Sequence, residues 1–453
     1  MPKDKLTDYS ATNASNTDVG GVNIDEGMLP SAVNNALREL LTHLKEFSDG
    51  TSGIDVLSLA DDDASAAMKL QAPASVTSDT TLTLPDGDGD SGQTLITNGS
   101  GTLSWAAPYG NRNLIINGAM QVAQRSTSVT GIGGSAGYFT VDRFDMYFSG
   151  TAGRLTQSQA DVTDLSGFAH ALKLDCTTAD TSIAAGEIAI LQYAIEGQDL
   201  QQFKKGYSDA ESFTVSFYVK GNASATYTIE LQDNDNSRQN TQTFDVTTGW
   251  TRVVKTFSPD TTGKFGNDNG ASLRIQIYLQ AGSDYTGGTF TSNTWASISN
   301  ANTVKSDQTM FFDSTDRTLE ITGVQLEVGE QATPFEHRSF GEELARCQRY
   351  YWQVAGTSQL VGQGFYYSSG EVDCIVHFPQ TMRATPTFTS SNNSGDFGFM
   401  NNSDNFDTWT AQQFFDGSRV NVYTISGVSG TTGYAGYIRM LNATSKIQFD
   451  AEL

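Results

Sequence analysis

Residues 212–231, SFTVSFYVKGNASATYTIEL, contain two candidate strands, 212–220 and 225–231, separated by a short polar turn. Further candidate strands lie on both sides of this segment, at 171–175, 187–195, 250–257, 273–279, 308–313 and 319–327. About eight short strands with polar loops between them are typical of an antiparallel sandwich. We therefore predict a mainly β chain whose largest domain, residues 111–338, is an antiparallel sandwich.

The composition fits this prediction. The chain has 453 residues, a length for which about three domains are expected, with 38% hydrophobic residues and 44 glycines. That mixture is typical of many short strands joined by turns. Only two segments, 28–47 and 339–353, are predicted to be helical.

The charge balance excludes one class of partner. The chain carries 51 acidic and 27 basic residues, a net charge of −24. Because nucleic-acid binding requires a surface of Lys and Arg, we expect no nucleic-acid partner. No apolar stretch reaches the roughly 18 residues that span a bilayer, and the first twenty residues contain no apolar core of a signal peptide, so we also expect no membrane insertion.

The helix predicted at 28–47 carries apolar residues at spacings of 4, 3, 4 and 3. They are Val33, Leu37, Leu40, Leu44 and Phe47. This spacing fits the seam of a coiled coil, and equally a helix packed on its own domain. The flanking sequence is too polar to supply a core, and a lone helix of this length is marginal in water. Self-association, as a homotrimer interface, is therefore the favoured interpretation.

The remaining segments complete the predicted order. Residues 1–50 form a leader that ends in this trimerising helix, and residues 51–110 form a narrow β shaft, whose strands alternate with Asp/Gly/Asn turns. Residues 339–353 form a linker helix with acidic residues first and basic residues last, which suits the helix dipole. Residues 354–453 form a C-terminal β-sandwich with long Ser/Asn/Gly loops.

Candidate ligand-binding residues are the aromatic side chains of this C-terminal domain, because aromatic rings stack on the apolar faces of sugars. The candidates are Trp409, Tyr366, Tyr367 and Tyr434, and for each of them packing in a core is the alternative. Asp233, Asp235 and Asp268 lie in Asp/Asn turns and are weak candidates for a structural calcium. Such turns also form for conformational reasons alone. We predict no other metal site and no cofactor.

No catalytic residue is predicted. The four histidines and three cysteines are scattered along the sequence. Glycoside hydrolysis needs two carboxylates, but with 51 acidic residues some pair always exists, so this criterion is uninformative. We expect a protein that is not an enzyme.

Several segments resemble bacteriophage tail-fibre proteins. They are the leader at 8–47, LPDGDGDSGQTLITNGSGTLSW at 84–105, NRNLIINGAMQVAQR at 111–125, ATPFEHRSFGEELARCQRYY at 332–351 and HFPQTMRATPTFT at 377–389. The order of residues 212–231, GWTRVVKTF at 249–257 and LEITGVQLEVGEQATPFE at 319–336 is similar to jelly-roll carbohydrate-binding modules.

This resemblance implies an elongated homotrimer located in the virion tail. The leader would dock on tail adaptor or nozzle proteins, and the C-terminal domains would face the host and bind a surface glycan or other receptor. A head or neck fibre of the same build is one alternative. A glycan depolymerase is the other, although no repeated parallel β-helix pattern is present.

Overall fold

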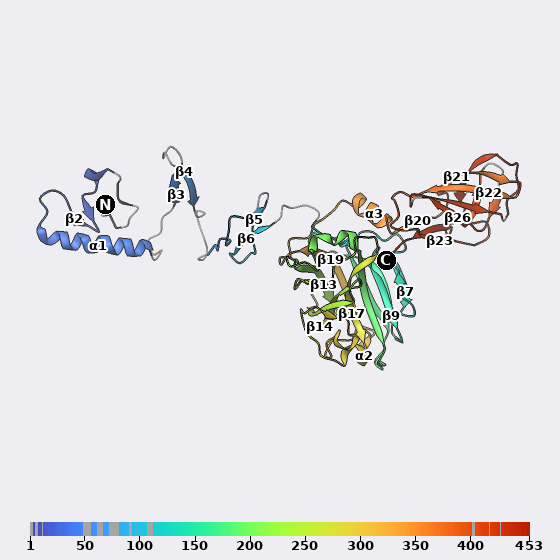
Figure 1. Ribbon diagram of the computed structural model, residues 1–453, viewed down its shortest axis with the longest axis horizontal. Helices are drawn as coiled ribbons and strands as arrows, with labels where there is room; N and C mark the ends of the chain where they lie inside the picture. The colour runs from blue at the N-terminus through green and yellow to red at the C-terminus, as the bar shows by residue number, and fades with distance from the viewer. Residues whose placement is uncertain are drawn as a thin grey trace. The chain divides into compact units, whose positions relative to one another are not determined.

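The computed structural model describes residues 3–4, 8–10, 12–48, 56–60, 67–71, 81–89, 93–106, 112–400, 404–415, 417–425 and 427–453. The chain divides into two compact units, Met1–Pro108 and Tyr109–Leu453. Most regular elements are strands in antiparallel sheets (Figure 1), which confirms the predicted mainly β fold class. No helix in the described residues is long and apolar enough to cross a membrane.

The described residues of the first unit contain one long helix and three small hairpins. Helix α1 spans Pro30–Ser48, close to the predicted 28–47, and Pro30 occupies the first turn, where a missing N–H costs no hydrogen bond. The hairpins pair β1 (Asp18–Val19) with β2 (Val22–Asn23), β3 (Val56–Ala60) with β4 (Ala67–Gln71), and β5 (Thr94–Thr97) with β6 (Leu103–Ala106). Residues 51–55, 61–66, 72–80, 90–92 and 107–110 of the predicted shaft lie outside the described residues.

Helix α1 has two different faces. Ala36 and His43 are buried, and the Tyr9 hydroxyl lies 2.8 Å from Nδ1 of His43, so this face packs on the leader. The other face is apolar and exposed. Its residues are Val33 (48% exposed), Leu37 (55%), Leu41 (58%), Leu44 (45%) and Phe47 (42%). Leu40 is half-buried, so Leu41 joins the predicted set in the structure.

The second unit begins with the predicted sandwich. One sheet has the order β16-β13-β19-β11-β10-β7 and the other β18-β15-β14-β17-β12-β9-β8. The strands are β7 (Ser128–Ile132), β8 (Gly137–Tyr138), β9 (Asp145–Ser149), β10 (Arg154–Asp161), β11 (His170–Thr178), β12 (Ile188–Glu196), β13 (Phe213–Gly221), β14 (Ala225–Asp233), β15 (Arg238–Val246), β16 (Thr251–Phe257), β17 (Ala271–Ala281), β18 (Ala296–Ser297) and β19 (Thr318–Val328). Apolar side chains of both sheets fill one core between them.

One predicted strand is wrong. Residues 308–313 form no strand and end in a short 3-10 turn, Phe311–Asp313. Phe311 and Phe312 are fully buried in the sandwich core. The apolar signal at this position therefore reflects burial of the loop that precedes β19 and not a strand.

The predicted linker helix is shorter than expected. Helix α3 spans Phe340–Gln348, and Ser339 caps it by accepting a hydrogen bond from the Glu342 N–H. The following aromatic residues belong to β20 (Tyr351–Ala355), which pairs with β29 (Lys446–Asp450). Aromatic side chains favour strands, and here the pairing with β29 ends the helix.

The C-terminal domain, here called the tip, is a sandwich of two unequal sheets. The smaller has the order β20-β29-β23, and the larger β25-β24-β28-β21-β22-β27-β26. Its other strands are β21 (Leu360–Ser368), β22 (Glu371–His377), β23 (Thr387–Ser390), β24 (Phe397–Phe399), β25 (Asp404–Phe406), β26 (Thr410–Phe415), β27 (Arg419–Thr424) and β28 (Ala435–Met440). A separate core lies between the two sheets.

A buried joint connects the sandwich to the tip. Arg143 pairs with Glu452, and its guanidinium lies 3.5 Å over the ring of Tyr350. Arg125 lies 3.6 Å over the ring of Tyr351 and reaches Asp450 at 2.8 Å. Both arginines come from the sandwich, so the C-terminal residues of the chain are held by charges of the preceding domain.

Candidate ligand-binding site

The register of the seven-stranded sandwich sheet places five polar side chains in one row. Antiparallel partners share a face of the sheet, and the successive pairs here are Asp145↔Gln192, Gln192↔Gln276, Gln276↔Glu230 and Glu230↔Thr241. These residues alternate along their strands with residues of the core, such as Leu191. The row therefore crosses β9, β12, β17, β14 and β15 on the sheet face away from the core. We call it the polar row.

Hydrogen bonds fix the side chains of the polar row. Nε2 of Gln192 donates to Oδ2 of Asp145 at 2.6 Å, and Nε2 of Gln276 donates to Oε1 of Gln232, in the next row, at 2.7 Å. The Tyr278 hydroxyl donates to Oε2 of Glu230 at 2.6 Å. The amide and carboxyl groups are thus held in defined orientations before any ligand arrives.

Two protein segments border the polar row along β12. On one side, Ile190 and Tyr278 form an apolar cluster with Val304, against which Tyr285 of the short helix α2 (Ser283–Thr286) packs. On the other side, Arg349, just after α3, pairs with Glu196 at 2.8 Å. Figure 1 shows α2 and α3 at opposite ends of the sandwich. Along β12, Gln192 and Ala194 lie between Ile190, which packs in the apolar cluster, and Glu196, which pairs with Arg349.

The carboxyl groups of the polar row have unusual proton affinities. Burial raises the pKa of Glu230 to about 7, against the hydrogen bond from Tyr278, which lowers it. Burial also raises the pKa of Asp145 to about 6, opposed by the Gln192 hydrogen bond and by the charge of Arg274. Near neutral pH each carboxyl group therefore accepts hydrogen bonds when ionised and donates one when protonated.

The arrangement provides many hydrogen-bonding groups in a small area. Each Gln amide of the row carries two N–H donors, and the contacts above use one of each. Nε of Arg274, which lies beside Gln276 along β17, is buried and has no hydrogen-bond partner among the described residues. Tyr147, 42% exposed, stands opposite Ile190 at the border of the row. All five residues of the row are 8% exposed or less, so only a small part of each group reaches the surface. Groups of this kind suit a ligand rich in hydroxyl groups.

Sequence reasoning missed this site. Its residues come from four distant segments, and only the strand register shows that they share a row. One feature of the sequence could have indicated the site: Gln192 is the only polar amide in the otherwise apolar run IAILQYAI at 188–195.

The structure removes two of the four predicted ligand-binding residues. Trp409 is 6% exposed and meets Phe406 edge-on at 4.6 Å between ring centroids. Tyr366 is 1% exposed, and its hydroxyl donates to Asp404. A buried ring offers no face to a sugar, so both are core residues. Tyr367 (62% exposed) and Tyr434 (59%) are at the surface of the tip.

The weak calcium candidates are engaged with protein donors. Asp233 is fully buried, and its Oδ2 lies 2.6 Å from Nζ of Lys205, which also contacts Asp260 at 3.1 Å. The side chains of Asp235 and Asp268 accept backbone hydrogen bonds, each at 2.8 Å. The ammonium group of Lys205 thus lies where a calcium ion would contact Asp233. The described residues contain no group of three or more His, Cys, Asp or Glu side chains that could hold a metal ion.

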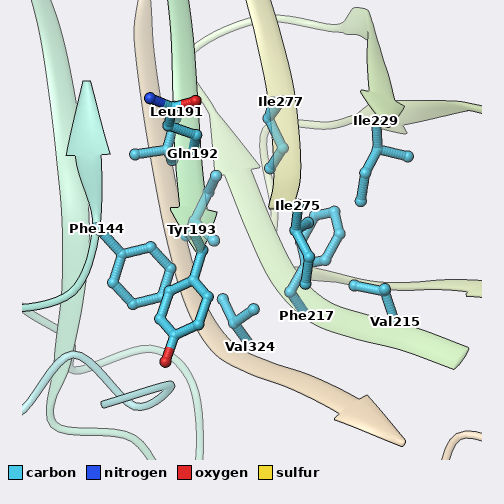
Figure 2. A pocket seen from close by; sticks show the side chains of 11 residues that line it. Phe144, Leu191, Gln192, Tyr193, Val215, Phe217, Ile229, Ile275, Ile277 and Val324 are labelled. Atoms are coloured by element: carbon cyan, nitrogen blue, oxygen red, sulfur yellow. The ribbon is translucent and has the colours of Figure 1, made fainter. Parts of the chain in front are cut away.

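The sandwich core also contains a small cavity of about 20 Å³ (Figure 2). Its lining comes from both sheets and is almost entirely apolar, with Phe217, Ile229, Ile275 and Val324 among its residues. A space of this size holds about one water molecule, and an apolar cavity stays dry. It is a packing gap and not a ligand site.

No family model and no curated protein matches the chain. Solved structures match at low similarity. A structure described as "CBM4 structure and function" matches with a TM-score of 0.24 and 11% identity, covering 47% of this chain and 97% of that chain. The enzymatically active domain of tailspike protein 4 from bacteriophage CBA120 matches with a TM-score of 0.24 and 11% identity, covering 48% and 21%. A family 61 carbohydrate-binding module in complex with β-1,4-galactotriose gives a TM-score of 0.24 and 8% identity, covering 48% and 99%.

Proposed function

We propose that this chain is a trimeric fibre protein of a bacteriophage virion and that it binds glycans of the host surface through the polar row. The tail-fibre resemblance of the leader, of residues 84–105 and of residues 332–351 supports the place in the virion. The leader docks on tail adaptor or nozzle proteins, and the domains after it recognise the host.

The polar row carries the glycan proposal. Sugars present hydroxyl groups that both donate and accept, and the row offers amide donors next to carboxyl and amide acceptors. The internal hydrogen bonds hold these groups in place, so a ligand loses little free energy to ordering them. Tyr147, exposed at the border, supplies a ring for the apolar face of a sugar.

The exposed face of α1 is proposed to join three copies of this chain. Its exposed apolar residues follow one another at spacings of 4, 4, 3 and 3, and the set that includes the half-buried Leu40 has the alternating spacing of a coiled-coil seam. In the single chain, Leu37 and Leu41 are 55% and 58% exposed, and the opposite face is already packed on the leader. Trimerisation would also multiply weak glycan contacts into avidity.

We propose binding without cleavage. The two carboxyl groups of the row, Asp145 and Glu230, stand on strands separated by β12 and β17. Three strand spacings place their Cα atoms about 14 Å apart. The two carboxyl groups of a glycoside hydrolase lie roughly 5 to 10 Å apart, so this spacing does not favour cleavage. Release of reducing ends from host polysaccharide would support the depolymerase alternative instead.

Retention of the full chain on immobilised host polysaccharide tests the binding proposal. The double variant Gln192→Ala/Gln276→Ala should bind about tenfold more weakly or worse, because two hydrogen-bonding side chains are lost. Gln359→Ala, an exposed glutamine of the tip, serves as the control and should bind as the natural chain does. Equal binding by a folded double variant would refute the assignment of the polar row.

Light scattering tests the trimer separately. The expected mass is three times the 48.7 kDa of the chain. Leu37→Asp/Leu41→Asp should give the single-chain mass, because three carboxylates would meet at each layer of the seam. Asn34→Asp, also exposed on α1, should leave the mass unchanged. A natural chain of single-chain mass would contradict the fibre proposal.

A further inference from the structure

The larger sheet of the tip has an outward face built from aromatic and polar residues. In one row, Phe365 stands opposite Asp373, and Asp373 stands opposite Tyr423. The neighbouring row contains Tyr437, Gln363, Ile375 and Asn421. Residues between them along the strands, such as Cys374, face the core. We call these seven residues the tip face.

Two acceptor atoms on the tip face have no donor. Oδ1 of Asp373 and Oδ1 of Asn421 are buried and make no hydrogen bond with the described residues. The remaining atoms of the two groups are engaged, because Nδ2 of Asn421 donates to Oδ2 of Asp373 at 3.2 Å and to Oε1 of Gln412 at 2.6 Å. These contacts also fix the orientation of the amide. Asp373 is only 8% exposed, so its unpaired oxygen is costly unless a ligand satisfies it.

The rings around these acceptors are accessible. Phe365 is 43% exposed and Tyr437 is 44% exposed, while Tyr423 is half-buried. Phe365 and Tyr423 stand on the two strands that flank Asp373, so their Cα atoms are about 10 Å apart. Tyr367, predicted from the sequence as a ligand-binding residue and 62% exposed, follows Phe365 by two residues and lies on the same face.

We propose that the tip face is a second saccharide site, which takes a neutral pyranose sugar. The apolar face of the sugar stacks on Phe365 or Tyr423. Two of its hydroxyl groups donate to Oδ1 of Asp373 and Oδ1 of Asn421, which are covered in the unliganded chain and become accessible when the neighbouring side chains shift. The inference rests on the proposed function for the class of ligand, but it uses a different domain and different residues from the polar row.

The chemistry of the tip face favours a sugar over the alternatives. An anionic ligand would meet the carboxylate of Asp373 at the centre of the face. A contact between copies of this chain would place that carboxylate at the centre of the interface, where charged residues are depleted. Aromatic rings beside hydrogen-bond acceptors match a sugar, which has apolar C–H faces and O–H donors at its edge.

Saturation-transfer NMR on the full chain tests the tip face with D-glucose, D-galactose, D-mannose and N-acetyl-D-glucosamine, and with D-glucuronic acid as the acidic comparison. The parent is Gln192→Ala/Gln276→Ala, so that binding by the polar row is already weakened. Binding of at least one neutral sugar by this parent is expected. Adding Asp373→Ala or Phe365→Ala should weaken it about tenfold or more. Adding Tyr207→Ala, an exposed ring of the sandwich, should not.

The outcomes separate the two proposals. Binding by the natural chain but not by the parent would overturn the tip site and leave the polar row standing. Binding by the parent that survives Asp373→Ala and Phe365→Ala would also overturn the tip site, as would binding of none of the neutral sugars. A lower assembly mass for Phe365→Ala would identify the tip face as a contact between copies and overturn the saccharide assignment. Retention on host polysaccharide decides the polar row independently.

Discussion

Replacing Lys205 by Met should strongly destabilise the sandwich, although Lys205 belongs to neither proposed site. Its side chain is fully buried, and Nζ lies 2.6 Å from Asp233, 3.1 Å from Asp260 and within 2.9 Å of the carbonyl oxygens of Thr262 and Gly263. Met retains most of the side-chain volume but removes the only ammonium group in these contacts. Two buried carboxylates then lose a counter-charge.

The expected loss of stability follows from the hydrogen bonds that Asp233 and Asp260 retain after the substitution. Asp260 keeps its two hydrogen bonds from Arg238, but Asp233 retains only Asn236 as a side-chain donor. Removing one partner of a buried ion pair costs about 3 to 5 kcal/mol. For a domain of this size that corresponds to a fall in midpoint temperature of about 10 °C.

Differential scanning calorimetry of the full chain measures the shift, with Lys204→Met as the matched control. Lys204 is the preceding residue, and its contacts with Asp209 and Glu211 are at the surface, with 47% of its side chain exposed. The control should change the sandwich transition only slightly, because exposed pairs contribute little. Equal shifts for the two variants would refute the view that the Lys205 ammonium acts as a built-in structural cation.

Three further predictions concern the polar row, the joint and the tip core. Because burial raises the pKa of Glu230 from 4.5 to about 7, the folded chain binds the proton more tightly, and stability should fall by about 3 kcal/mol as pH rises from 4.5 to 8. Glu230→Gln should remove most of this pH dependence in thermal melts, and an unchanged pH profile would contradict the assignment. Arg143→Met should cost about 3 kcal/mol, because Glu452 is buried and would keep only Arg125. Limited proteolysis should then cut between the sandwich and the tip, and a resistant variant would argue against a structural role for the joint. Trp409→Ala should destabilise the tip by about 3 to 5 kcal/mol in calorimetry, whereas Tyr434→Ala should have little effect. Similar values for both would contradict the burial of Trp409.

The parts of the structure that local pattern determines were predictable. Strands such as β13 and β14 carry their own signal, and Pro30 marks the start of α1 in the sequence itself. The polar row was not predictable, since Gln192 and Glu230 become neighbours only through the register of β12, β17 and β14. The prediction that Trp409 binds a ligand was wrong for a similar reason. Its flanking sequence is polar and does not indicate that the ring packs on Phe406 of the preceding strand.

The distribution of charge argues for a neutral ligand at both proposed sites. The chain has 27 basic residues against 51 acidic ones, and several of the basic groups are engaged inside the fold. Lys205 and Arg143 are buried in ion pairs, and Arg338 is 6% exposed and pairs with Glu343. Acidic residues outnumber basic ones by about two to one, and the burial of these three cations widens the imbalance at the surface. We therefore expect an anionic polysaccharide to be repelled at low ionic strength.

Binding to a neutral polysaccharide should accordingly change little between 10 and 300 mM salt, because it depends on hydrogen bonds and ring contacts. An anionic polysaccharide should bind more weakly in low salt, where the screening length is about 30 Å, than at 0.15 M, where it is about 8 Å. Binding that is tight at low salt and lost as salt rises would instead indicate attraction to a basic surface. It would contradict the assignment of both sites, since the polar row and the tip face each contain carboxyl groups and no Lys or Arg side chain.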